Sequence, residues 1–240
     1  MRVKTLHYCW FGGNPFPEVV KKCMESWKKY CPDYRIVEWN ESNFNIHCCK
    51  YVEEAYNEKK WAFVSDYCRF FVLYSYGGIY LDTDVELIKT IDDLPENFVG
   101  FEDKETCNSG LIRGAQKGDM ICEKMLKSYN DDAFISEDGS LNLKTVCERE
   151  TDILKLYGLK GNGCMQNVCG TTVFPKDYFS PKDYVTQKVH ITERTYSIHH
   201  YAYSWQGEKE NISSKIYRCL YKIFGAKFAN KVRDIFGKKK

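Results

Sequence analysis

The feature that most constrains the fold is an alternation of short apolar strands with an amphipathic helix near the N-terminus. Residues 3–10 are typical of a buried strand that ends at GGNPFP, and Pro17 can open a helix over residues 18–30. A second short strand, RIVEW, follows at residues 35–39. A strand, a helix and a strand in this order predict an α/β domain with a ligand crevice at the strand ends.

The following segments continue this pattern. We expect a buried helix over residues 61–77, closed by Gly77, and a strand over residues 78–82. Two more strands are predicted in NFVGFE and NSGLIRG, a helix in GDMICEKMLKSY, and a strand-rich stretch in VHITERTYSIHHYAYSW. Because no linker interrupts the chain before about residue 212, we predict one domain over residues 1–212 and a separate segment over 213–240.

The segment 213–240 differs from the domain in charge. It carries nine Lys or Arg against one acid, Asp234, whereas the other 212 residues carry 26 basic and 32 acidic side chains. Its apolar residues recur every three to four positions, which predicts a basic amphipathic helix. We expect this helix to lie on the anionic inner leaflet of a membrane rather than on nucleic acid. The alternative is that its apolar face packs back onto the domain.

Composition indicates a globular protein. Of its 240 residues 43% are hydrophobic, which is enough for a sizeable core, and no window approaches the ~18 apolar residues of a membrane span. We expect no secretory signal, because the N-terminal apolar stretch is broken by His7 and a glycine pair. The twelve cysteines include no Cys-x-x-Cys and are expected to be reduced core residues of a cytoplasmic protein.

Three acids follow the apolar run GGIYL at every second position: Asp82, Asp84 and Glu86. In a strand they would lie on one side, so at least two carboxylates converge. Such carboxylates repel each other unless a cation neutralises them, and a hard divalent cation such as Mg²⁺ or Mn²⁺ is suited to this. The alternative, a solvated edge strand, fits the apolar, glycine-rich run poorly. Glu86 is expected to leave the site as a strand-end charge.

A charged pair and an aromatic residue are further candidates. Asp66 and Arg69 stand three apart in the buried helix, so they share one face and form either a structural ion pair or a ligand-binding pair. Trp10 precedes two glycines at a strand end, where it could stack on a nucleobase or belong to the core.

Polar side chains cluster again in SIHHYAYSW: His199, His200, Ser204 and Trp205. A single histidine is more often a core or surface residue than a ligand. Two adjacent histidines, in a chain whose acids need a further metal ligand, make a metal site about as probable as a structural role.

Taken together, HYCWFGG, WAFVSDYCRFFVLYSYGGIYLDTDVE, NSGLI and TYSIHHYAYSW resemble glycosyltransferase family 32 over about residues 3–206. This family contains bacterial capsular and outer-polysaccharide glycosyltransferases and is related to yeast Golgi α-mannosyltransferases. The large clostridial glucosylating toxins are distant relatives in fold.

The resemblance implies an α/β GT-A (Rossmann-like) fold, here with the C-terminal amphipathic helical tail. It also implies Mn²⁺ or Mg²⁺, a nucleotide-sugar donor (a UDP-sugar rather than a GDP-sugar), a saccharide or lipid-linked oligosaccharide acceptor, and retention of anomeric configuration. Carried over by position, the metal ligands are Asp84 with His199 or His200. The residues implied in catalysis are Asp66, Arg69, Asp82 and Asn108, and those implied in donor binding are Trp10, Asp66, Arg69, Tyr80, Asp82, Ser204 and Trp205.

Two other classes of protein share parts of these patterns. Haloacid-dehalogenase-like phosphatases also place aspartates after an apolar strand, but that strand lies near their N-terminus. A cation-dependent carbohydrate-binding module could use the same acids to hold Ca²⁺ and sugar hydroxyls. Such a module would need neither Trp10 nor the buried pair of Asp66 and Arg69.

Overall fold

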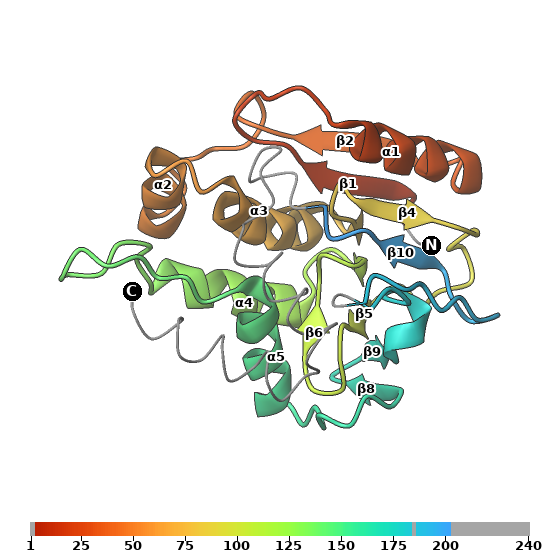
Figure 1. The fold of residues 1–240 in the computed structure, drawn as a ribbon. Coiled ribbons are helices and arrows are strands. Elements are labelled where there is room, and N and C mark those ends of the chain that lie inside the picture. Colours follow the sequence, from red (N-terminus) through yellow and green to blue (C-terminus); the bar gives the residue numbers. More distant parts are fainter. Residues whose placement is uncertain (1–2, 184–185, 203–240) are drawn as a thin grey trace.

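The structure is a computed structural model that describes residues 3–183 and 186–202 (Figure 1). It begins with the predicted unit: β1 (Thr5–Cys9), α1 (Glu18–Tyr30) and β2 (Arg35–Trp39). Strands β1 and β2 pair in parallel, and β3 (Gly78–Tyr80) pairs in parallel with the other side of β1. The predicted strand–helix–strand start is therefore confirmed, and it puts the end of β3 beside the end of β1.

Eight strands form one mixed sheet in the order β2-β1-β3-β7-β5-β9-β8, with β6 added to β5. The predicted strand NSGLIRG is wrong as a single element, because it divides into β6 and β7 around a turn that Leu111 closes by donating to the Asn108 carbonyl. The five strands of this half are β5 (Phe98–Phe101), β6 (Cys107–Asn108), β7 (Arg113–Ala115), β8 (Gln166–Val168) and β9 (Thr171–Phe174).

Helices cover both faces of this sheet (Figure 1). One core lies under α2 (Lys50–Asn57), α3 (Trp61–Tyr76), α4 (Met120–Asn130) and α5 (Val146–Leu156). The other lies under α1 and a small sheet of β4 (Val85–Leu87) and β10 (Ser197–His199), near the 3-10 turn Lys176–Tyr178. Successive side chains of β3 point to opposite faces of the sheet, so Tyr80 packs in the core under α2–α5 and Ile79 in the core under α1.

Gly77 ends α3 as predicted. Its φ of +69° is in the region that favours glycine, and a Cβ there would stand 2.7 Å from the backbone nitrogen of Lys117. This close approach lets the chain turn from the helix directly into β3, so α3 and the residues after β3 line the same space.

The remaining predictions concern one helix, one strand-rich stretch, the cysteines and the C-terminal segment. The helix in GDMICEKMLKSY is confirmed as α4, while only Ser197–His199 of the expected strand-rich stretch is β-strand in the described residues. The eleven cysteines of the described ranges form no disulfide. No helix there has the length and apolar character to cross a membrane. The predicted helix over 213–240 and the residues Ser204 and Trp205 lie outside the described residues.

Candidate active site

Asp82 and Asp84 lie in a turn and not in a strand, so the expected strand over 78–82 is too long, whereas Glu86 belongs to β4. Strand β3 ends at Tyr80. The Asp82 N–H donates to the Gly110 carbonyl at 3.0 Å, and the Val85 N–H closes the turn on the Asp82 carbonyl at 3.1 Å. The chain must leave the main sheet here because β4 pairs with β10 in the small sheet. The carboxylates still converge, but through this turn and not through strand alternation.

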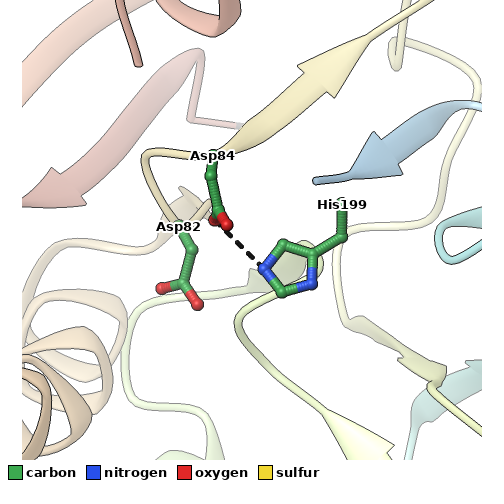
Figure 2. Close-up of side chains that lie close together, drawn as sticks. All are labelled: Asp82, Asp84 and His199. Carbon is green, nitrogen blue, oxygen red and sulfur yellow. Dashed lines mark ion pairs between the residues drawn. The ribbon is translucent and has the colours of Figure 1, made fainter. Parts of the chain in front are cut away.

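Three side chains form a cluster of possible metal ligands: Asp82, Asp84 and His199 (Figure 2). We call these three metal-ligand candidates the donor set. Their ligand atoms all lie within 4.8 Å of one another. His199 Nε2 is 3.0 Å from Asp84 Oδ1, and the Ala202 N–H donates to Asp84 Oδ2 at 2.7 Å. The pairing of β10 with β4 sets His199 opposite Val85, which brings the imidazole to the acids.

The buried pair of Asp84 and His199 is strongly polarised. Burial opposes charge on Asp84, but the His199 imidazole and the Ala202 N–H outweigh it and lower the pKa of Asp84 to about 2. Burial likewise opposes charge on His199, yet Asp84 raises its pKa to about 9. Protonated His199 therefore serves as the counter-ion of Asp84 when no other cation is bound.

A second charged group adjoins the donor set. Arg69 Nη2 lies 2.9 Å from Asp66 Oδ1 and 3.2 Å from Asp82 Oδ1, and the guanidinium stacks over the Tyr80 ring at 4.8 Å. The Tyr80 hydroxyl donates to Asp82 at 3.1 Å. Burial raises the pKa of Asp66 to about 7, against the attraction of Arg69. One guanidinium is thus shared by two carboxylates. A further positive charge nearby would stabilise the ionised form of these carboxylates.

Asn108 and Gly110 hold the turn from the other side. Asn108 Oδ1 accepts from the Gly110 N–H at 2.7 Å. A Cβ on Gly110 would collide with the Asp82 carboxylate and approach Asn108 Oδ1 to 2.9 Å. The absence of a side chain at Gly110 therefore fixes where the Asp82 carboxylate can lie.

These residues line one pocket of about 660 Å³. Its wall includes Trp10, Phe11 and Asn14 after β1, and the Trp10 Nε1–H donates to the Asn14 carbonyl at 2.7 Å. Trp10 is half-buried and its ring contacts Phe16 at 4.8 Å between centroids. A pocket of this size, apolar at one end and charged in the middle, is suited to a small organic ligand with an anionic group.

The donor set fits a hard divalent cation. The two carboxylates offer the oxygen ligands that both Mn²⁺ and Mg²⁺ prefer, and the imidazole favours the transition metal Mn²⁺ of the two. Two buried polar atoms of pocket-lining residues, Arg69 Nη1 and His199 Nδ1, have no hydrogen-bond partner within residues 3–183 and 186–202. Such atoms are costly unless something else satisfies them, which is consistent with a bound ligand.

The predicted site residues that the structure describes fall into two groups, while Ser204 and Trp205 lie outside the described residues. The structure brings Trp10, Tyr80, Asn108 and the two clusters of acids together in the pocket. It does not bring His200 there: its Nε2 pairs with Glu86 at 2.8 Å, and Glu86 also pairs with Lys22 at 3.4 Å. The structure therefore includes His199 and not His200 in the donor set, and it adds Asp82, which the resemblance assigned to the sugar or ribose.

Four residues at the site were missed from the sequence: Glu102, Cys147 and Tyr201, which line the pocket, and Gly110, which adjoins Asp82. Gly110 lies inside the quoted motif NSGLI and Tyr201 inside SIHHYAYSW, so both could have been found there. Glu102 and Cys147 carry no local signal, because long-range packing brings them to the pocket.

Comparisons with known proteins agree with this geometry. Residues 17–99, about a third of the chain, match the family described as a glycosyltransferase sugar-binding region containing a DXD motif. Inositol phosphoceramide mannosyltransferase 3 of Schizosaccharomyces pombe is 32% identical over 99 residues, which are 38% of this chain and 26% of that protein. The match thus spans about a quarter of that relative's length.

Solved structures are similar over larger parts. A structure titled PaToxG Glycosyltransferase has a TM-score of 0.51 and 20% identity, and the match covers 64% of this chain and 69% of that one. A glycosyltransferase involved in glycosylation of the major capsid of PBCV-1 has a TM-score of 0.46 and 11% identity, over 89% and 98% of the two chains. The predicted GT-A fold is confirmed, and residues 17–99 of this fold match a DXD-containing glycosyltransferase sugar-binding region.

Proposed function

We propose that this chain is a metal-dependent, retaining glycosyltransferase of family 32. It transfers a sugar from a nucleotide diphosphate sugar to a saccharide, in particular a lipid-linked oligosaccharide, in bacterial capsular or surface polysaccharide synthesis. The observation that carries the proposal is the donor set beside the Asp66–Arg69 pair, in one pocket that also contains Trp10.

Each part of the pocket has a role in donor binding under this proposal. Trp10 offers a flat face for the nucleobase, and Asp82, Asp84 and His199 would hold the divalent cation. When bound, the cation neutralises the diphosphate and acts as a Lewis acid on the leaving oxygen.

The sugar then lies against the charged group next to the donor set. Asp66 and Arg69 orient its hydroxyls, and the free Nη1 of Arg69 offers a further hydrogen bond to the sugar or its phosphate. Asn108 lines the same part of the pocket.

The transfer step needs no protein nucleophile. The acceptor oxygen forms a bond to the anomeric carbon while the bond from that carbon to the diphosphate oxygen breaks, and the electron pair leaves with the diphosphate. In a front-face attack the hydroxyl proton passes to the released diphosphate. Arg69 stabilises the negative charge that develops on the leaving group. A sugar adduct trapped on a side chain during turnover, detected by mass spectrometry, would contradict this mechanism.

Thermal unfolding tests the donor site directly. Nucleoside diphosphate with Mn²⁺ should raise the melting temperature of the full chain. Hydrolysis and transfer are then measured with UDP-galactose, UDP-glucose, UDP-N-acetylglucosamine and GDP-mannose. The mannosyltransferase relative makes GDP-mannose the natural alternative to the UDP-sugars. Stabilisation by Ca²⁺ and free sugar, without any response to nucleotides, would favour a carbohydrate-binding module instead.

We further propose that the protein is cytoplasmic and peripheral on the inner face of the membrane, through residues 213–240. The nine basic residues of this segment support the proposal. Deleting residues 213–240 should abolish binding to anionic liposomes. Unchanged liposome binding by the truncated chain would remove this part of the proposal.

A further inference from the structure

One wall of the pocket remains unassigned after the donor has been placed. It consists of Glu102, Asp103, Cys147, Lys176 and Tyr201, which line the same pocket as His199. The Tyr201 ring packs edge-on against the His199 ring, with 4.2 Å between centroids. This wall therefore starts at the donor set, where the acceptor of a sugar must meet the donor.

Glu102 is held in place by a chain of hydrogen bonds. The Tyr201 hydroxyl lies 2.8 Å from the hydroxyl of Ser180, which is fully buried, and it also bonds Glu102. Because a carboxylate only accepts, Tyr201 donates to Glu102 and Ser180 donates to Tyr201.

The backbone at Tyr201 supports a functional origin for this arrangement. Its φ of +55° is in the left-handed region, which is unfavourable for a residue with a bulky side chain. Conformations of this kind persist where surrounding contacts enforce them, and they concentrate at binding sites. Here the contacts are the His199 ring on one side and the Ser180 and Glu102 partners on the other.

The charge of this wall restricts what can bind. Among the described residues of this wall, the charged side chains are Glu102, Asp103 and Lys176, so acids outnumber bases. Asp103 is already engaged, because its Oδ1 accepts from the backbone N–H groups of Glu105 and Thr106 at 2.8 Å each. A carboxylate or phosphate group of an acceptor would be repelled by these carboxylates, whereas a sugar hydroxyl can donate a hydrogen bond to Glu102.

A buried polar atom is consistent with a ligand in the pocket. Arg69 is 4% exposed and lines the pocket, and its Nη1 has no hydrogen-bond partner among the described residues. This observation is independent of the acids, because a donor or acceptor oxygen is what such an atom requires.

From these contacts, and resting on the proposed function, we propose that Glu102 is an acceptor-binding residue. Its carboxylate accepts a hydrogen bond from a hydroxyl of a neutral saccharide acceptor, and it disfavours acceptors that carry a carboxylate or phosphate beside that hydroxyl. Tyr201 is its positioning residue, acting through the bond to Glu102.

Acceptor kinetics with the full chain test this role. Wild type should transfer to methyl glucoside in preference to methyl glucuronide and glucose 6-phosphate, with Mn²⁺ and the best donor sugar. Glu102→Gln keeps the shape and removes the charge. It should raise the KM for methyl glucoside about tenfold and reduce the preference over methyl glucuronide, while donor hydrolysis stays within about twofold. Tyr201→Phe keeps the ring on His199 and should raise the acceptor KM by a smaller factor without changing the donor KM.

The matched control is Glu105→Gln, an exposed carboxylate in the same loop that does not line the pocket. It should leave both acceptor and donor kinetics unchanged. The inference is overturned if Glu102→Gln keeps the wild-type preference for the neutral sugar, or loses donor hydrolysis in the same proportion as transfer. It is also overturned if wild type hydrolyses a donor yet no neutral saccharide alters that rate. A wild-type chain that neither binds nor cleaves any nucleotide sugar would instead refute the proposed function.

Discussion

Two clusters of buried charge differ in how their arginines are used. In the pocket cluster, Arg69 pairs with Asp66 and Asp82 through one nitrogen, and its Nη1 has no partner in the part of the chain that the structure describes. In the scaffold cluster, made of Arg113, Asp119 and Glu150, every arginine nitrogen has an acceptor.

The scaffold cluster is enclosed by the fold. The Arg113 Nε–H donates to Glu150 at 3.0 Å, its Nη1 donates to the carbonyls of Phe98 and Gly114, and neither charged side chain is exposed. A fully satisfied arginine cannot bind anything further, whereas one with a free nitrogen on a pocket can. The comparison therefore assigns stability to one cluster and ligand binding to the other.

Removing an acid of the donor set should have the largest effect. Asp84→Ala should lower metal-dependent turnover at least about a thousandfold, because the cation loses a ligand that stabilises the transition state. The fold should survive, since His199 can release its proton once Asp84 is gone and no unpaired charge stays buried. Turnover is measured by donor hydrolysis and folding by circular dichroism. Asp33→Ala, an exposed acid with a 78% accessible side chain, is the control and should change neither.

For Arg113→Met we expect the opposite result, a loss of stability with the binding site intact. It leaves Glu150 buried without its partner, so the free energy of unfolding should fall by about 3–5 kcal/mol, with metal and donor affinity retained in the folded fraction. Urea titration measures the loss. The double variant Arg113→Met with Glu150→Leu should recover part of it, because no unpaired charge remains. Full stability of Arg113→Met would contradict the structural role.

Arg69→Lys tests the pocket arginine with a substitution that keeps its positive charge. Lysine keeps the positive charge but cannot serve two carboxylates and a ligand with a planar fork. We expect turnover to fall about a hundredfold while the melting temperature shifts less than in Arg113→Met. An equal loss of stability in the two variants would remove the distinction between the clusters.

Gly110→Ala should have the smallest effect of the four. The new Cβ would push the Asp82 carboxylate from its place, so turnover should fall about tenfold with little change in stability. Gly161→Ala is the matched control, because its Cβ would meet only ordinary contacts at 3.4 Å from Glu105. A Gly110→Ala enzyme as active as wild type would show that the position of Asp82 is not critical.

The sequence allowed the parts of the fold with local signals to be predicted. Pro17 and the apolar period gave α1, and Gly77 correctly marked the end of α3. Helix α5 was missed although Thr145 and Glu148 form a capping box, whose spacing is visible in the sequence.

The donor set was only partly predictable, because its geometry depends on distant pairing. Period 2 assumed that Asp82 and Asp84 continue a strand, whereas β3 ends at Tyr80 and both acids lie in the turn that follows. The choice of His199 over His200 follows from the register of β10 on β4, since adjacent side chains of a strand lie on opposite sides. Nothing local in the sequence specifies this register.

The pairing of β10 with β4 also determines when, during synthesis, the three residues of the donor set can come together. Ala202 donates to Asp84 across 118 positions of the chain, and Asp84 meets its histidine through the same strand pair. A nascent chain that has completed the main sheet still lacks the third ligand until the last described strand leaves the ribosome. Closing so long a loop is entropically costly, so the cation site should be among the last parts to form and the first to open.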